Sequence, residues 1–231
     1  MKLSIIIPCY NEVGTIFEII NKIINLKYKI EKEILIVDDF SNDGTTELIK
    51  KNFLNQKDII AIFHKKNSGK GSAIKTAKKL ITGDIVIIQD ADLEYDPNDY
   101  EKLIKPIIDN NVKVVYGSRV LNQNRYSAKG FTSKIRVFGN HVLTIISNIL
   151  NNQKLTDAHT CYKLFHKEVF DQIILEEDDF SFCPEVNSKV SKLGYEILEV
   201  PISYNGRDYQ SGKKIKLSDA FKALKTLIKY R

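Results

Sequence analysis

Apolar segments and amphipathic segments alternate along the first half of the chain. The segments with the length and composition of strands are residues 3–8, 33–39, 59–64, 85–90 and 114–118. The segments with helical periodicity between them are residues 13–26, 45–53, 71–80 and 98–110. The strands are apolar almost throughout, which is typical of a sheet covered by helices on both faces. The pattern therefore predicts an α/β fold with a mostly parallel, doubly wound sheet.

Length and composition favour a single domain over residues 1–231. The chain has 231 residues, of which 43% are hydrophobic, enough to bury one full core. It contains no internal repeat and no apolar stretch near the ~18 residues of a membrane span. Residues 1–8 have the pattern of a core strand and not of a signal peptide. Cys9, Cys161 and Cys183 show no CxxC spacing, so we expect free thiols in a cytoplasmic protein.

The positive charge is concentrated at the C-terminal end. The formal net charge is +6, and residues 207–231 contain eight basic and two acidic side chains, a difference that accounts for all of it. Such a segment suits contact with phosphates or an anionic membrane, although a solvated helix face has the same composition. A nucleic-acid partner is not favoured, because aromatic residues are not interleaved with the basic ones.

Four carboxylates follow the predicted strand at residues 85–90. In IVIIQDADLEYDP they are Asp90, Asp92, Glu94 and Asp96. A lone Asp at a strand end is more often a turn or helix cap, and we expect this role for Asp96. Asp90 and Asp92 differ, because alternate residues of an extended segment point the same way and two unneutralised carboxylates repel. A divalent cation, Mg²⁺ or Mn²⁺, would neutralise the pair and bridge it to the phosphates of a nucleotide.

Two other predicted strands end in polar groups that would lie on the same edge of the sheet. PCYNE (residues 8–12) follows the first strand, and VDD (residues 37–39) ends the second. Ligands of open α/β sheets bind at this carboxyl edge. The segment HKKNSGKGSAIKTA (residues 64–77) lacks the GxxxxGK[ST] pattern of a phosphate-binding loop. We expect its glycines to permit a tight entry into a helix, with Asn67 and Lys70 facing the edge.

Taken in order, PCYNE, VDDFSNDGT, NSGKGSAI, QDADLEYDP and YGSR resemble the motifs of family 2 glycosyltransferases with the GT-A fold. The similarity is greatest to the dolichol-phosphate mannosyltransferase group, which moves a sugar from a nucleotide to a polyprenyl phosphate. TDAHTCYKLF, FCPEV, GYEILEVPISYNGRDYQSGKKI and LIKYR extend it over essentially the whole chain. The resemblance implies a nucleotide-sugar-binding half at residues 1–120 and an acceptor-binding half with the basic tail at residues 121–231.

The resemblance also assigns roles to individual residues. The donor site it implies consists of Pro8, Tyr10, Asn11, Glu12, Asp39, Lys70 and Ala91 together with the acidic pair. The metal ligands it implies are Asp90, Asp92 and Glu94, with Asp92 the more direct. Arg119 occupies a phosphate-contacting position, and the segment that closes on the diphosphate contains Arg207, Lys213 and Lys214. We assign Arg136 and Asp157 to the acceptor, although Ala158 and His159 stand where relatives often carry an acidic residue.

The implied reaction is a metal-dependent, inverting transfer of a hexose, of mannose or glucose type, to a polyprenyl (dolichyl or undecaprenyl) phosphate. Such an acceptor is already anionic at neutral pH, so no general base is needed, while metal and arginine neutralise the leaving diphosphate. Transfer to a sugar hydroxyl stays open as an alternative and would require Asp157 or Glu185 as a base. A non-catalytic nucleotide-sugar-binding subunit is disfavoured by the intact acidic pair. The motifs do not distinguish GDP-mannose from UDP-glucose.

Two predicted helices carry apolar stripes. Residues 132–150 align Ile135, Phe138, Val142, Ile145, Ile146 and Ile149. The tail aligns Leu217, Phe221, Leu224 and Ile228, with Lys222, Lys225 and Lys229 opposite. Such stripes usually face a core. A lipid-linked acceptor favours contact with an anionic membrane surface instead, so we expect a peripheral protein on the cytoplasmic face, bound directly or through a membrane subunit.

Overall fold

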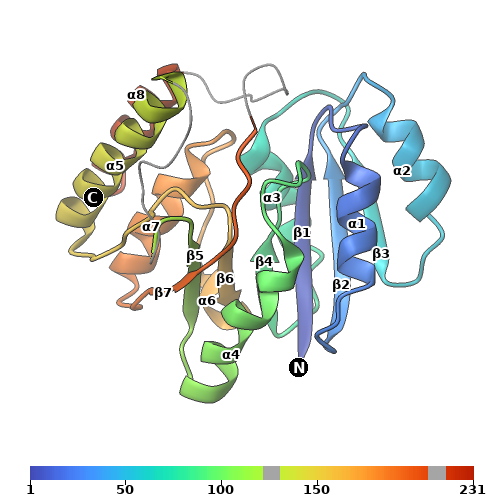
Figure 1. Ribbon diagram of the computed structural model, residues 1–231, viewed down its shortest axis with the longest axis horizontal. Helices are drawn as coiled ribbons and strands as arrows, with labels where there is room; N and C mark the ends of the chain where they lie inside the picture. The colour runs from blue at the N-terminus through green and yellow to red at the C-terminus, as the bar shows by residue number, and fades with distance from the viewer. Residues whose placement is uncertain (122–130, 208–216) are drawn as a thin grey trace.

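The computed structural model describes residues 1–121, 131–207 and 217–231, and for residues 131–136 and 217–218 it describes the backbone alone. Its centre is a seven-stranded sheet with the order β3-β2-β1-β4-β6-β5-β7 (Figure 1). The strands are β1 (Lys2–Cys9), β2 (Glu31–Asp38), β3 (Ile59–Phe63), β4 (Ile85–Ile88), β5 (Val114–Ser118), β6 (Lys163–His166) and β7 (Leu198–Pro201). The helices are α1 (Ile16–Ile24), α2 (Thr45–Phe53), α3 (Lys70–Lys78), the 3₁₀ turn η1 (Pro97–Asp99), α4 (Tyr100–Asn110), α5 (Phe131–Asn151), α6 (Lys167–Gln172), α7 (Phe182–Lys192) and α8 (Leu217–Lys229).

All strands of this sheet except β6 run in the same direction. β1 pairs in parallel with β2 and β4, β2 with β3, and β5 with β7. β6 is antiparallel to both of its neighbours, β4 and β5. The carboxyl ends of the parallel strands therefore reach one edge of the sheet. Cys9 at the end of β1 lies beside Asp38 at the end of β2, so the loops that follow them start together.

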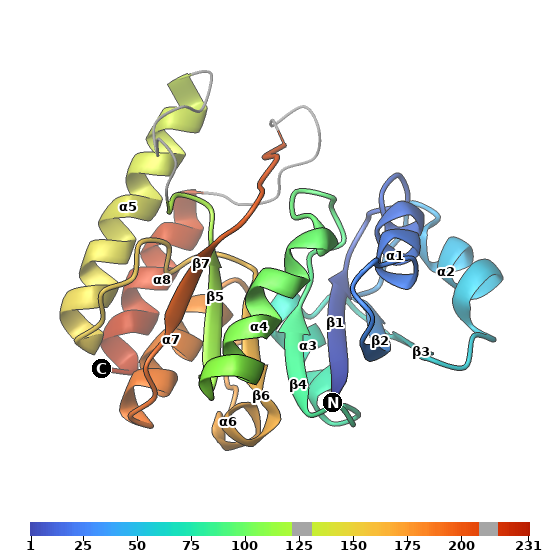
Figure 2. The same ribbon diagram turned by 60° about the horizontal axis from the view of Figure 1, so that its bottom comes forward.

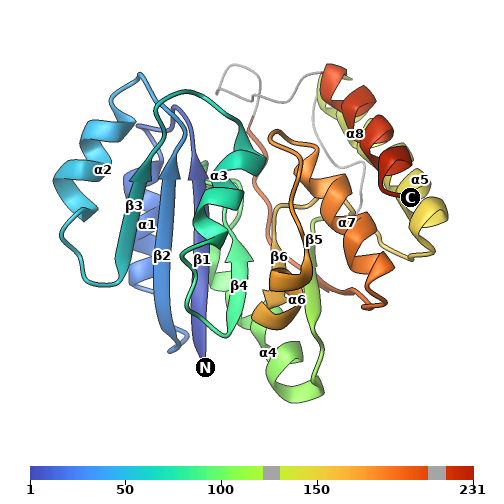
Figure 3. The same ribbon diagram turned by 180° about the vertical axis from the view of Figure 1, so that it is seen from behind.

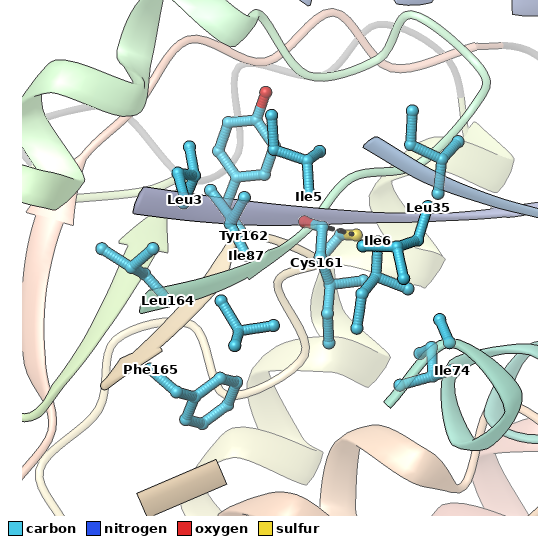
Figure 4. Packing of buried hydrophobic residues seen from close by; sticks show 14 of the residues in the cluster. Leu3, Ile5, Ile6, Leu35, Ile74, Ile87, Cys161, Tyr162, Leu164 and Phe165 are labelled. Carbon is cyan, nitrogen blue, oxygen red and sulfur yellow. Dashed lines mark hydrogen bonds between the residues drawn. The ribbon is translucent and has the colours of Figure 1, made fainter. Parts of the chain in front are cut away.

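The interior of the sheet is apolar because its central strands lack the alternating polar positions of a half-exposed sheet. Ile5, Ile6 and Ile7 of β1 and all four residues of β4 are fully buried. Figure 4 shows side chains from β1, β2, β4, β6 and α3 packed together in this core. Burying one such isoleucine stabilises the fold by about 1.5–3 kcal/mol. This core fixes the strand ends from which the loops of the carboxyl edge depart.

Helices cover both faces of the sheet. α1 and α4 lie on one face (Figure 1), and α3, α6 and α7 lie on the other (Figure 3). α5 and α8 lie side by side beyond the β7 end of the sheet (Figures 1 and 2), where both also contact α7. None of the described helices is both long enough and apolar enough to cross a bilayer.

The predicted α/β fold and the mostly parallel sheet are confirmed. The predicted strands and helices are all present, with ends that differ by a few residues. The pattern missed β6, β7, α6 and α7. β6 is only four residues long and begins with a lysine, and β7 begins with Leu198, which is 40% exposed. Neither strand therefore produces the continuous apolar run that identified the others.

Candidate active site at the carboxyl edge of the sheet

The loops after β1 and β2 are bonded to each other at the carboxyl edge. The backbone N–H of Asn11 donates to Oγ of Ser41 at 2.8 Å, and Oδ1 of Asn11 accepts from the backbone N–H of Asn42 at 2.9 Å. The backbone N–H of Glu12 donates to Oγ1 of Thr45 at 2.9 Å. These bonds hold PCYNE against VDDFSNDGT, so the predicted donor residues of the two motifs lie on one rim.

Asp90, which follows β4, is paired with Lys70. Gly69 has a φ of 97°, a left-handed conformation that glycine adopts readily, and it turns the chain into α3, of which Lys70 is the first residue. Nζ of Lys70 donates to Oδ1 of Asp90 at 2.5 Å. Burial alone would lower the pKa of Lys70, but the charge of Asp90 outweighs it and raises that pKa well above its usual value. Lys70 therefore faces the carboxyl edge of the sheet, as expected, and its role in the donor site stays a prediction.

Arg207 joins carboxylates from two different loops. Its Nη1 and Nη2 donate to the two oxygens of Glu12 at 3.0 and 3.1 Å, and Nη2 also donates to Oδ2 of Asp92 at 2.9 Å. Its backbone N–H donates to Oε1 of Glu94 at 2.7 Å. Burial opposes the charge, but the bonds to Glu12 and the charge of Asp92 raise the pKa of Arg207 overall. A residue from the tail thus lies at the acidic motif, although 115 positions separate it from Asp92.

Asp92 is held close to other carboxylates. Its pKa is raised to about 7, first by burial and then by the negative charges of Asp90 and Glu94. Leu93 has a φ of 61°, a conformation rare for leucine, and the turn lets the backbone N–H of Glu94 donate to Oδ1 of Asp92 at 3.1 Å. A strained backbone and a disfavoured charge in one turn are typical of a functional site.

The residues present fit a divalent cation that is shared with phosphate oxygens. Mg²⁺ is usually held by one or two carboxylates plus the phosphates of its substrate, and Asp90 and Asp92 supply two carboxylates. Within the described part of the chain, no group of three or more Asp, Glu, His or Cys side chains converges on one point. Glu94 instead accepts hydrogen bonds from the hydroxyl of Tyr204 at 2.7 Å and from the Arg207 backbone. The assignment of Glu94 as a third metal ligand stays a prediction.

Asp39 fixes the turn that carries Lys70. Its carboxylate accepts the backbone N–H of Ser68 at 2.9 Å and that of Gly69 at 2.6 Å. Nδ1 of His64 lies 2.7 Å from the same carboxylate, and the second ring nitrogen lies 2.9 Å from Oγ1 of Thr76. Both ring nitrogens of His64 thus have partners, and the ring is held beside the turn. A contact between Asp39 and the donor stays a prediction.

Arg119 and Asp157 form a bidentate ion pair after β5. Nε and Nη2 of Arg119 donate to the two carboxylate oxygens at 2.7 and 2.8 Å. Burial would raise the pKa of Asp157, but Arg119 lowers it below its usual value. Glu199 of β7 accepts the backbone N–H groups of Thr156 and Asp157 at 2.6 and 2.9 Å, and the Tyr204 ring centre lies 5.1 Å from the Arg119 guanidinium. Glu199 and Tyr204 were missed because the pattern did not predict β7.

The remaining predicted site residues are Pro8, Tyr10, Ala91, Arg136, Lys213 and Lys214. Lys213, Lys214 and the side chain of Arg136 lie outside the described residues. Ala91 is buried between the two aspartates. Their roles stay predictions.

Known proteins are similar to this chain in sequence or in fold. A family model described as Glycosyl transferase family 2 matches residues 4–174. A dolichyl-phosphate beta-glucosyltransferase of Trichomonas vaginalis is 30% identical, over 98% of this chain and 72% of its own length. A UDP-N-acetylglucosamine–dolichyl-phosphate N-acetylglucosaminyltransferase of Methanococcus voltae is 30% identical, over 98% of this chain and 94% of its own length.

A solved structure confirms the predicted GT-A fold. Glucosyl-3-phosphoglycerate synthase of Mycobacterium tuberculosis, in complex with Mn²⁺, UDP and glucosyl-3-phosphoglycerate, superposes with a TM-score of 0.75 at 16% identity. The match covers 99% of this chain and 79% of that one, and at this identity it concerns the fold alone. The family match spans most of the chain, and it identifies the family to which the chain belongs. The chain belongs to glycosyl transferase family 2 and is a glycosyltransferase.

Proposed function

We propose that the protein is a metal-dependent, inverting glycosyltransferase that moves a hexose from a nucleotide sugar to a polyprenyl phosphate. The observation that carries this proposal is the rim on which Asp90 and Asp92 lie against Lys70 and Arg207. The two relatives named above act on dolichyl phosphate by name, one with glucose and one with N-acetylglucosamine. The sugar and the base of the donor therefore stay open between UDP-linked and GDP-linked forms.

Lys70 and Arg207 are the cations that we assign to the leaving diphosphate. Both are held at the carboxylates that would share the metal, which when bound supplies Lewis-acid neutralisation of the diphosphate. An ammonium and a guanidinium fork fixed at this place stabilise the charge that develops on the leaving group. Arg207 belongs to residues 121–231, the half that we assign to the acceptor, so this half also contributes to the donor site.

The described carboxylates near the acceptor side favour a phosphate over a sugar hydroxyl. Asp157 is bonded to Arg119 through both oxygens. Glu185 is fully buried and accepts backbone N–H groups from Glu176 and Glu177. Neither carboxylate is placed to take a proton from an incoming hydroxyl. A phosphate monoester needs no such base because its second ionisation lies near pH 6.

Arg119 is the group that we assign to the acceptor phosphate. A guanidinium has five N–H donors in one plane, and the two that bond Asp157 fix its orientation. We assign its Nη1 edge to the phosphate oxygens, with Arg136 as a second contact.

The helices α5 and α8 present apolar side chains outward, and we assign this surface to the membrane that would hold the acceptor. On α5 the buried face is polar, with Thr144, Ser147 and Asn151 at no more than 7% exposure. Its outward face is apolar, and so is part of α8. We call the exposed members the α5–α8 apolar face: Phe138 (59% exposed), Val142 (37%), Ile145 (44%), Ile149 (74%), Phe221 (72%) and Ile228 (62%). A water-facing helix has the reverse arrangement, so this face favours an apolar partner phase.

Two of the three α8 lysines that we expect to contact anionic lipid also form ion pairs within the described chain. Lys222 pairs with Asp179 at 2.7 Å, and Lys229 pairs with Glu177 at 2.9 Å. Contact of Lys222, Lys225 and Lys229 with lipid stays a prediction. The apolar face is therefore the stronger support for a peripheral position on the cytoplasmic face of a membrane.

A transfer assay tests the proposal. The protein is incubated with UDP-glucose, UDP-N-acetylglucosamine or GDP-mannose, with Mg²⁺ or Mn²⁺, and with a polyprenyl phosphate in detergent. We expect one donor to give a lipid-linked product with inverted anomeric configuration, and no product from Asp92→Asn. Transfer to a glycan hydroxyl without transfer to the lipid phosphate would overturn the acceptor assignment. Binding of a nucleotide sugar without any transfer would favour the non-catalytic alternative.

A further inference from the structure

An acidic loop packs directly against the turn that carries Lys70. We define the acidic loop as residues 176–179, with the sequence EEDD, between α6 and α7. The backbone N–H of Ser72 donates to the carbonyl of Asp178 at 3.0 Å, and Nζ of Lys75 donates to its carboxylate at 2.5 Å. A Cβ added at Gly71 would lie 2.3 Å from the carbonyl oxygen of Glu177, so the two backbones leave no room for a side chain. The position of this turn, and with it that of Lys70, depends on the acidic loop.

The opposite side of the acidic loop is held by α8. Nζ of Lys222 donates to Oδ2 of Asp179 at 2.7 Å. Nζ of Lys229 and the hydroxyl of Tyr230 both donate to Oε1 of Glu177 at 2.9 Å. The acidic loop is thus the contact through which α8 and the adjoining Tyr230 meet the donor turn, and the bonds described for these residues go to the acidic loop and not to Lys70 or Asp90.

We propose that the acidic loop is a positioning element for the donor, and that Lys222 and Lys229 of α8 hold it in place. With these lysines in their ion pairs, the turn at Gly69 and Gly71 keeps Lys70 against Asp90, where it meets the diphosphate. The inference rests on the proposed function only in taking the donor to be a nucleotide diphosphate sugar. It also makes the donor site dependent on a helix that exposes Phe221 and Ile228.

The test compares lysines of one helix that carry the same charge. The double variant Lys222→Gln/Lys229→Gln removes the two ion pairs. Lys225→Gln is the matched control, because Lys225 is exposed on the same helix and forms no ion pair with the part of the chain that the structure describes. Calorimetry measures the binding of UDP and of GDP in the presence of Mn²⁺, and hydrogen exchange measures protection of the amides at residues 68–74.

The double variant should bind the nucleotide diphosphate about three- to tenfold more weakly, since each exposed ion pair contributes little and the two act on one loop. Exchange at residues 68–74 should become faster, while Lys225→Gln should match the wild type in both measurements. Unchanged affinity and unchanged exchange in the double variant would overturn the proposal. Equal effects of substituting Lys222, Lys225 and Lys229 would also overturn the proposal, because they would show that the lysines act only through their positive charge.

A charge swap covers the case in which the double variant does not fold. Asp179→Lys should loosen residues 68–74, and adding Lys222→Asp should restore their protection. Failure of the restored pair to protect them overturns the positioning role. The exchange measurement needs no ligand, so it decides this proposal even if the wild type binds neither UDP nor GDP. Failure of the wild type to bind either nucleotide would instead overturn the assignment of a nucleotide sugar as the donor.

Discussion

Replacing Arg207 with glutamine should change the affinity for Mn²⁺ in opposite directions without and with a nucleotide. Nη2 of Arg207 lies 2.9 Å from Oδ2 of Asp92. An ion coordinated by that oxygen lies about 2.1 Å from it, so the guanidinium would be no more than about 5 Å from the ion. At that distance charges of +1 and +2 repel by about 1.7 kcal/mol even in the dielectric of bulk water, a factor of about 15 in affinity.

We expect Arg207→Gln to bind Mn²⁺ about tenfold more tightly than the wild type when no nucleotide is present, because the side chain can partly swing away from a bound ion. With UDP or GDP present the order should reverse, since the guanidinium then forms charge-assisted hydrogen bonds to the diphosphate, worth about 1.5–3 kcal/mol. Electron paramagnetic resonance of unbound Mn²⁺ measures both affinities. Lys105→Gln is the control, because it removes the same charge from an exposed pair with Glu101 on α4. Unchanged or weaker Mn²⁺ binding by Arg207→Gln without nucleotide would refute the idea that the guanidinium of Arg207 and the metal ion repel each other at Asp92.

Three further results are expected. Without nucleotide, Mn²⁺ affinity should fall by about tenfold for each pH unit below 7, because the pKa of Asp92 is about 7 and the protonated carboxyl is a poor ligand. Asp92→Asn should show no such pH dependence, and an Mn²⁺ affinity of the wild type that stays constant from pH 8 to 6 would contradict this reasoning. Gly71→Ala should lower both the melting temperature and the affinity for nucleotide diphosphate, because its Cβ would lie 2.3 Å from the backbone of the acidic loop. Gly139→Ala in α5, where a Cβ has nothing within 4 Å, should leave the affinity unchanged. Equal effects of the two substitutions would show that the acidic loop moves away without disturbing the donor site. Phe221→Ser should reduce sedimentation with lipid vesicles without lowering the melting temperature. Leu54→Ser, at a residue that is 50% exposed after α2 at the β3 end of the sheet, should leave sedimentation unchanged, and equal binding of both variants would remove the membrane from the proposal.

The fold could be predicted wherever burial alone determines the pattern. The middle of β1 and of β2 and the whole of β4 are buried, so these positions are almost all apolar, and the helices between the strands have one apolar side. β6 could not be found this way because it contains the buried Lys163. Nζ of this lysine donates to the carbonyl of Ala158 at 2.9 Å and lies 3.8 Å from the Tyr116 ring centre. A buried lysine whose charge is stabilised by its neighbours in the fold interrupts the apolar pattern of the sequence, so the pattern does not identify the strand.

The site could be predicted in its residue types but not in its pairings. Spacing alone identified Asp90 and Asp92, and the resemblance assigned Arg207 to the same site. The contact of Arg207 with both Glu12 and Asp92 depends on the path of the chain after β7, which no local pattern encodes. The pairing of Arg119 with Asp157 likewise depends on how β5 and the segment before β6 come together.

The orientation of α5 could not be determined from periodicity, because an apolar stripe at helical spacing has the same period whether it faces a core or a solvent. The other face of the helix resolves the question. Oγ1 of Thr144 donates to the carbonyl of Asn140 at 2.8 Å, and Nδ2 of Asn151 donates to Oγ of Ser147 at 3.2 Å. The carbonyl of Asn151 also accepts the hydroxyl of Ser191 on α7 at 2.5 Å. Because Thr144, Ser147 and Asn151 form these bonds, the helix avoids for them the roughly 1–3 kcal/mol that each unpaired buried group would cost. The exposed isoleucines and phenylalanine on its outer side are left uncovered by the described chain, and this exposure is the reason that we propose an apolar phase outside the protein as their partner.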